Sequence, residues 1–294
     1  MDSLEGFTRR RLASEGTELC VAVGGPEDAP PVCLLHGFPE THLMWHRVAP
    51  VLARRFRVVC PDLRGYGDSG KPQGGPGHVN YSKRAMALDV VELMGMLGHD
   101  RFRLVGHDRG ARVSHRLAID HPDRVEKLVL MDIVPSSTVY GTVNQQVATA
   151  YFHWFFLIQR TPLPERYLGL DPETFLRAFL RGLGPTADAF PEAVLREYLR
   201  VLREPAAIHA MCEDYRAGAT IDLAHEAEDK AEGRRIAAPT LILWGSRGLV
   251  GKAYDVMAVW REICADARGR ALDCGHFLPE EDPDGTLAAL EGFL

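Results

Sequence analysis

The chain has 294 residues, of which 46% are hydrophobic and 25% are charged, and its formal net charge is -6. This composition is typical of a globular protein with one large domain, or of a core that carries an insertion. The charges form no block of one sign, which argues against a nucleic-acid-binding or membrane-binding surface. A negatively charged substrate would need positive charge gathered locally around its site.

The cysteines and the apolar runs bear on where the protein works. Residues 1–12 contain no apolar core, so no signal peptide is predicted, and the longest apolar run, residues 151–158, is too short to cross a bilayer. The cysteines occur singly, without a CxxC pair or a spacing that suggests zinc. They are Cys20, Cys33, Cys60, Cys212, Cys264 and Cys274. We therefore expect a cytoplasmic protein with reduced, buried thiols.

Short β-rich segments alternate with segments of helical periodicity along most of the chain. Strands are expected, in chain order, at residues 18–23, 31–37, 56–62, 102–108, 125–133, 240–245 and 269–276. Helices are expected near residues 42–54, 81–97, 109–120, 253–265 and 284–294. This alternation predicts an α/β fold, in which a mostly parallel sheet is flanked by helices and functional residues collect at the carboxyl ends of strands.

The alternation stops between residues 134 and 236. That stretch has a helical pattern, is rich in aromatic residues and is interrupted by prolines. We interpret it as an all-helical cap inserted into an α/β core that consists of residues 1–133 and 237–294. A cap over the strand ends would close a pocket and exclude water from it.

A nucleophile elbow is predicted where the strand at 102–108 turns into a helix. Gly106 and Gly110 flank Asp108 at the spacing Gly-x-nucleophile-x-Gly, and the turn lifts the central side chain above the sheet at a helix N-terminus. A carboxylate there displaces a leaving group from saturated carbon and forms an ester on the enzyme. The competing interpretation is an aspartate that only caps the helix.

Two arginines follow this aspartate closely. Arg109 and Arg112 are three residues apart and share a helix face, although cations are disfavoured in the first turn of a helix. Paired guanidinium groups bind a carboxylate through bidentate hydrogen bonds, so the pattern predicts an acid as the substrate. Alternatively, both could be surface arginines that bridge acids such as Asp68 or Asp120.

Several motifs together carry a family resemblance. The segments HGFPET at 36–41, PDLRGYGDSGKP at 61–72, GHDRGAR at 106–112 and DCGH at 273–276 resemble the α/β-hydrolases of the dehalogenase and epoxide-hydrolase branch. Within that branch, the chain is similar to fluoroacetate (haloacetate) dehalogenases, through the residues Arg109, Arg112, His153, Trp154 and Tyr215. Haloalkane dehalogenases and most epoxide hydrolases usually carry tryptophan where Arg109 stands, which argues against a neutral substrate.

The resemblance implies the remaining catalytic groups. His276 follows the last strand, where this fold presents the histidine that activates water. Many relatives place the acid that orients this histidine after the strand at 240–245, but no acid occurs there before Asp255. Asp132, after the preceding strand, is therefore expected to fill the role, and the alternative is a residue that caps the next turn. The backbone N–H groups of Phe38 and Arg109 are expected to form the oxyanion hole.

The resemblance also implies a halide site. His153, Trp154 and Tyr215 would donate an imidazole N–H, an indole N–H and a phenol O–H to the departing halide. Without the arginines, the segment at 151–158 would be interpreted simply as the packed core of the cap. The implied reaction is hydrolysis of a short 2-haloacid, with fluoroacetate giving glycolate and fluoride. This reaction needs no metal or organic cofactor. Besides the substrate, the only partner expected is a second copy of the chain in a homodimer. The sequence leaves the preferred halogen open.

Two other functions are compatible with parts of this pattern. An epoxide hydrolase has the same aspartate, loop and histidine, and uses two cap tyrosines as acids. Tyr140, Tyr151, Tyr167, Tyr198 and Tyr215 leave that possibility open, whereas Arg109 speaks against it. A non-catalytic receptor for small molecules is disfavoured by the complete set of Asp108, Asp132 and His276.

Overall fold

The computed structural model describes residues 4–184 and 189–294 of the chain. Its strands are β1 (Thr8–Ser14), β2 (Thr17–Gly24), β3 (Pro31–Leu35), β4 (Arg57–Pro61), β5 (Phe102–His107), β6 (Val125–Met131), β7 (Thr240–Gly245) and β8 (Ala267–Leu272). The described residues form one eight-stranded sheet in the order β1-β2-β4-β3-β5-β6-β7-β8. Pairing is antiparallel from β1 through β2 to β4 and parallel through the rest of the sheet.

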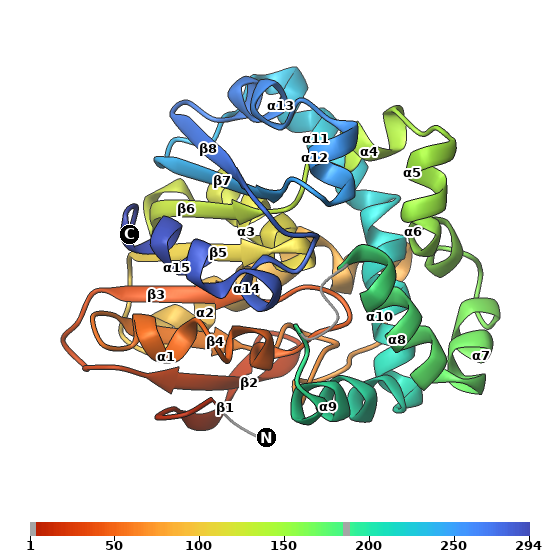
Figure 1. The fold of residues 1–294 in the computed structure, drawn as a ribbon, viewed down its shortest axis with the longest axis horizontal. Coiled ribbons are helices and arrows are strands. Elements are labelled where there is room, and N and C mark those ends of the chain that lie inside the picture. The colour runs from red at the N-terminus through yellow and green to blue at the C-terminus, as the bar shows by residue number, and fades with distance from the viewer. Residues whose placement is uncertain (1–3, 185–188) are drawn as a thin grey trace.

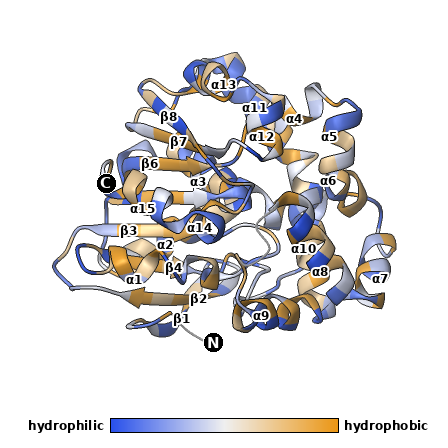
Figure 2. Cartoon of the chain, viewed as in Figure 1, coloured by the Kyte–Doolittle hydropathy of each residue, from blue (hydrophilic) through white to orange (hydrophobic). Residues whose placement is uncertain are grey.

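The central strands are apolar because both of their faces are covered. Nearly every residue of β3 and β5 is buried, as expected of parallel strands with helices on both sides. Figure 2 shows hydrophobic colouring concentrated along these inner strands. The α/β class and the mostly parallel sheet are thus confirmed. The first strand, β1, was not predicted, because its sequence TRRRLAS carries three arginines and lies at the sheet edge.

Helices cover both faces of the sheet. Those outside the segment between β6 and β7 are η1 (His42–Trp45), α1 (Ala49–Leu52), η2 (Pro76–Tyr81), α2 (Lys83–Met96), α3 (Asp108–Asp120), η3 (Pro122–Arg124), α12 (Leu249–Ala253), α13 (Val256–Ile263), α14 (Leu278–Glu281) and α15 (Pro283–Glu291). In Figure 1, α14 and α15 lie in front of the central strands and α3 lies behind them. The single helix expected at 42–54 is divided into η1 and α1, and the one expected at 253–265 is α13, which α12 precedes.

The described residues between β6 and β7 are mostly helical. Its helices are α4 (Ser136–Gly141), α5 (Gln145–Ala150), α6 (Phe152–Leu157), α7 (Leu163–Leu170), α8 (Pro172–Leu183), α9 (Glu192–Leu202), α10 (Pro205–Gly218) and α11 (Ile221–Glu232). Figure 1 shows α5 to α10 gathered beyond the end of the sheet toward which β5 runs. We call residues 136–232 the helical insertion. Among the described residues, no helix is both long enough and apolar enough to cross a membrane.

Candidate active site

Asp108 stands at a strained bend between β5 and α3. Its φ is 45°, a left-handed conformation that is costly for a residue with a side chain. The bend also requires close backbone approach, since a Cβ on Gly110 would lie 2.5 Å from the carbonyl oxygens of Leu35 and His36. A Cβ on Gly106 would lie 2.5 Å from the carbonyl oxygen of Gly110. The predicted elbow is therefore present, and its glycines are needed because there is no space for a side chain.

The carboxylate of Asp108 is buried but stays ionised. The backbone N–H of Phe38 donates to its Oδ2 at 3.1 Å, from the loop that follows β3. Burial acts to raise the pKa of Asp108, but the nearby basic side chains of His276, His107, Arg109 and Arg112 outweigh it and lower that pKa. Phe38 thus has the contact expected of an oxyanion-hole residue, while the same role for the Arg109 N–H stays a prediction.

Asp132 and His276 meet as the sequence predicts. Asp132 follows β6, also with a left-handed φ of 51°, and its Oδ2 lies 2.6 Å from His276 Nδ1. Its other oxygen accepts from the backbone N–H of Gly245 at 2.9 Å. The remaining histidine nitrogen, Nε2, lies 4.0 Å from Asp108 Oδ1. Asp255, the first acid after β7, caps α13 through the N–H of Ala258.

A buried polar chain behind His276 was not predicted. The Nε2 of His107 lies 2.7 Å from the backbone oxygen of His276. Its Nδ1 lies 3.3 Å from Glu40 Oε2, which also accepts from the Gly37 N–H at 3.1 Å. Glu280 is equally buried, and its pKa is raised well above the usual range by burial and by the charge of Glu40. The chain therefore joins the loop that carries Phe38 to the backbone of His276.

The two arginines are buried beside Asp108, so neither is a surface residue. Arg112 donates from Nη1 to the Val134 oxygen and to the Ser136 hydroxyl, both at 3.0 Å. Its Nε is buried and has no hydrogen-bond partner among the described residues. Burial and the neighbouring charge of Arg109 lower the pKa of Arg112, which indicates that the site favours an additional anion. The role of Arg112 in binding a substrate carboxylate stays a prediction.

Arg109 departs from the expected free clamp. Its Nε and Nη2 donate to the two carboxylate oxygens of Asp214, each at 2.8 Å, and Nη2 also donates to the Asp214 backbone oxygen. The acids named as alternative partners pair elsewhere, since Asp68 binds Arg9 and Asp120 binds Arg84. The sequence offers no local signal for the Arg109 contact, because Asp214 lies 105 residues further along the chain.

His153, Trp154 and Tyr215 gather above the elbow. The ring of Tyr215 lies 5.2 Å from that of Phe38 and 5.7 Å from that of His153. Burial lowers the pKa of His153 to about 3, so the ring is neutral and carries one N–H. Tyr215 Oη and His153 Nδ1 are buried without a hydrogen-bond partner among the described residues. Two aromatic faces contact the arginines. The centroid of the Trp154 ring lies 4.6 Å from Arg112 Cζ, and that of the Tyr215 ring lies 4.2 Å from Arg109 Cζ.

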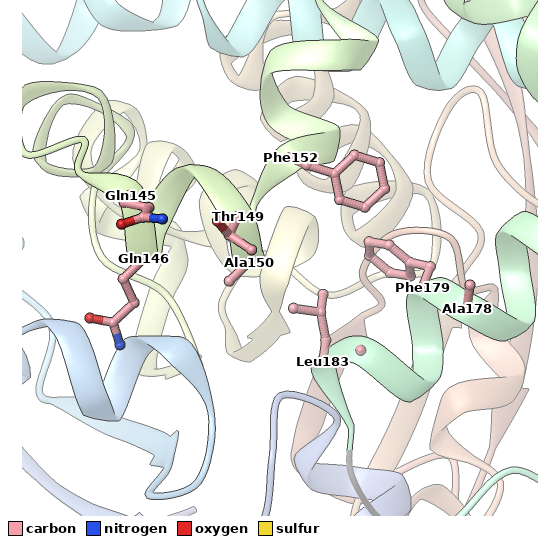
Figure 3. A pocket seen from close by; sticks show the side chains of 9 residues that line it. Gln145, Gln146, Thr149, Ala150, Phe152, Ala178, Phe179 and Leu183 are labelled. Carbon is pink, nitrogen blue, oxygen red and sulfur yellow. The ribbon is translucent and has the colours of Figure 1, made fainter.

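An open cavity of about 640 Å³ lies in the helical insertion. It is lined by Gln145, Gln146, Thr149, Ala150, Phe152, Ala178, Phe179, Gly182 and Leu183, from α5, α6 and α8 (Figure 3). Asp108 does not line it. Phe179 borders both regions, because its ring also contacts His153 at 4.8 Å and Phe38 at 5.2 Å. The cavity therefore adjoins the site at Phe179 and does not contain the reacting groups.

Comparison with known proteins agrees with this geometry. Residues 30–283 match the family model described as the alpha/beta hydrolase fold. The chain is 48% identical to a fluoroacetate dehalogenase from Burkholderia sp, covering 99% of this chain and 94% of that protein. It is 35% identical to a soluble epoxide hydrolase from Corynebacterium sp. (strain C12), covering 87% of each.

Solved structures extend the likeness to three dimensions. A structure from Nostoc sp PCC 7120, described as an alpha/beta hydrolase, superposes with a TM-score of 0.95 at 51% identity. The match covers 98% of this chain and 97% of that one. The sheet order, the family model that covers residues 30–283 and the similarity to these relatives lead to one conclusion. The chain belongs to the α/β-hydrolase family and is a hydrolase.

Proposed function

We propose that this hydrolase removes the halogen from short 2-haloacids, with fluoroacetate giving glycolate and fluoride. The observation that carries the proposal is the burial of two guanidinium groups beside an ionised carboxylate at a nucleophile elbow. Both Arg109 and Arg112 lie close enough to Asp108 to lower its pKa, although burial acts to raise it. Arg109 is already paired with Asp214, but the buried Nε of Arg112 has no acceptor among the described residues, and a neutral substrate would leave this guanidinium without an anion of its own.

The first step would form an ester on Asp108. The substrate carboxylate is held by Arg112 and by the unengaged nitrogen of Arg109, which places its α-carbon over the elbow. Asp108 Oδ1 attacks this carbon because Oδ2 is held by the Phe38 N–H. The carbon–oxygen bond forms as the carbon–halogen bond breaks, and the halide leaves with the bonding electron pair.

The second step would hydrolyse that ester. His276, oriented by Asp132, takes a proton from water as the water oxygen attacks Cγ of Asp108. Negative charge on the carboxyl oxygen is stabilised by the Phe38 N–H. The ester bond then breaks, and glycolate leaves with the proton that His276 took from water. The second proton of the water is released to solvent, which restores the Asp108 carboxylate with one oxygen derived from water.

The helical insertion would act as a cap that receives the halide. Fluoride is strongly hydrated, so a site that releases it must replace water with fixed donors as charge develops. Tyr215 and the neutral His153 each have a buried polar atom without a partner, which suits this role. The Trp154 N–H completes the proposed set.

The direct test is fluoride release from fluoroacetate, followed with an ion-selective electrode, beside chloroacetate and bromoacetate. Release that depends on Asp108 supports the proposal, and the Asp108→Asn variant provides the control. The 35% identity to a soluble epoxide hydrolase gives the alternative a specific basis. Diol formation from styrene oxide without halide release would favour that alternative instead.

The two-step scheme makes a prediction for His276→Asn. This variant should still form the ester but should fail to hydrolyse it, because no general base activates water. After incubation with haloacetate, mass spectrometry of the peptide that contains Asp108 should show the added carboxymethyl group. In the wild type, multiple turnovers in ¹⁸O water should label the Asp108 carboxylate. If His276→Asn is folded but its Asp108 peptide is unmodified after incubation with haloacetate, the two-step scheme is contradicted.

A further inference from the structure

The structure assigns a positioning role to Asp214 on α10: it fixes Arg109 so that one guanidinium edge is occupied and only Nη1 is presented to the substrate carboxylate. We propose that this makes Asp214 a determinant of the preference for an acid over its neutral amide. The inference rests on the proposed function. It assigns to the helical insertion a part in binding the substrate carboxylate, in addition to its proposed part in binding the halide.

The hydrogen bonds to Asp214 fix the orientation of the Arg109 guanidinium plane. Three hydrogen bonds of 2.8 Å run from Nε and Nη2 of Arg109 to the side chain and the backbone oxygen of Asp214. The two side chains are essentially inaccessible to solvent, at 1% and 0% exposed. A bidentate pair of this kind sets the orientation of the guanidinium plane as well as its position.

Helix α10 also contacts the flat face of the Arg109 guanidinium. The Tyr215 ring lies 4.2 Å from Arg109 Cζ. One turn further along the helix, Gly218 leaves room for the guanidinium, since an added Cβ would lie 3.1 Å from Nη2. Asp214, Tyr215 and Gly218 therefore form a cradle, and the halide-binding tyrosine is part of it.

Asp214 is in turn fixed by the core. Its carboxylate forms an ion pair with Lys83 at the start of α2, and its Oδ2 accepts from the Tyr66 hydroxyl at 2.7 Å. Burial acts to raise the pKa of Asp214, but Arg109 and Lys83 outweigh it and hold that pKa well below the usual range. The negative charge is thus permanent, and it links the helical insertion to two separate parts of the core.

The test compares Asp214→Asn with Asp229→Asn, a matched control. Asp229 makes a similarly buried pair between the same helix, α3, and the insertion, through bonds of 2.7 Å and 3.1 Å to Arg116. The readout is kcat/KM for chloroacetate divided by kcat/KM for chloroacetamide, its neutral analogue. Asn retains one acceptor but places an amide N–H against the guanidinium, so Arg109 should shift.

We expect Asp214→Asn to lower kcat/KM for chloroacetate about tenfold, mainly through KM, and to change that for chloroacetamide by less than about twofold. Asp229→Asn should leave the ratio unchanged. If Asp214→Asn does not fold, as judged by circular dichroism, Gly218→Ala replaces it with the same expectation. An unchanged ratio in the folded variant, with both substrates affected equally, would overturn the proposal.

Acetate binding separates this inference from the proposed function. If the wild type releases no halide from any haloacetate, the proposed function fails, and calorimetric titration with acetate then tests Asp214 alone. Weaker acetate binding to Asp214→Asn than to the wild type and to Asp229→Asn would support the positioning role. Equal affinity, or no acetate binding by the wild type, would overturn it.

Discussion

Arg109 and Arg112 are adjacent on one helix face, yet their hydrogen bonding differs. Arg109 has one edge saturated by Asp214, whereas the Nε of Arg112 is buried without a hydrogen-bond partner among the described residues. A buried donor that lacks a partner costs about 1–3 kcal/mol, and a substrate carboxylate would supply that partner. Arg112 is therefore the arginine with the greater capacity to gain from binding.

Replacing Arg112 tests this difference. Arg112→Leu should raise KM for haloacetate and lower kcat/KM by about a hundredfold, since a charge-assisted pair is lost while Asp108 is retained. Steady-state kinetics provide the measurement. Arg177→Leu, an exposed arginine of α8 that pairs with Glu173 and Glu192, is the control and should behave as the wild type. Wild-type kinetics in Arg112→Leu would remove this residue from the carboxylate site.

Tyr215 should matter more for fluoride than for chloride. Tyr215→Phe removes one buried hydroxyl, so kcat for fluoroacetate should fall about tenfold to a hundredfold, while chloroacetate, with its better leaving group, should be affected less. The ratio of the two halide-release rates gives the result directly. An equal loss for both substrates would indicate that the hydroxyl orients the site and does not receive the halide.

At the scale of elements, the turn between β5 and α3 depends on Gly110 for its close approach to the loop after β3. Gly110→Ala would force a Cβ to 2.5 Å from two backbone oxygens, so unfolding in urea should show a loss of about 3 kcal/mol or more. Gly182→Ala in α8 is the control, because no atom lies within 4 Å of the added Cβ and alanine favours a helix. A stable Gly110→Ala would contradict this account of the turn.

The residues that follow strands were predictable, and those held only by long-range pairing were not. Asp108 and Asp132 end apolar runs that any parallel sheet would bury, so their place at the carboxyl edge follows from the pattern. Asp214 directly precedes Tyr215, but nothing in the segment CEDYRAG indicates that it pairs with Arg109, and this partner becomes apparent only when the fold brings α10 to the first turn of α3. Glu40 belongs to the HGFPET motif, but nothing local indicates that it pairs with His107.

At the scale of the whole molecule, the buried chain from Glu40 to His276 links stability to pH. Burial acts to lower the pKa of His107, but the charge of Glu40 outweighs it and raises the pKa to about 9. Because the folded value exceeds the ordinary 6.5, the stabilisation is complete below that pH and is lost as pH rises through 9. The shift corresponds to about 3 kcal/mol.

This gives a prediction for the free energy of unfolding. Between about pH 6 and pH 10, the wild type should lose more stability in urea titrations than His107→Gln, which has no titrating ring. The two proteins differ only at this ring, so the difference between their slopes reports on His107 together with the buried carboxyl groups of Glu40 and Glu280 that interact with it. Parallel slopes would show that His107 is not protonated in the folded protein.

The contact between Arg109 and Asp214 has a consequence for recombining parts of this family. The residues proposed to attack and to hydrolyse come from the core, and those proposed to receive the halide come from the helical insertion. A chimaera that exchanges the insertion would also replace the carboxylate that orients Arg109. Exchanging the insertion to change the accepted leaving group would then weaken binding of the substrate carboxylate, unless the new insertion carries an aspartate equivalent to Asp214.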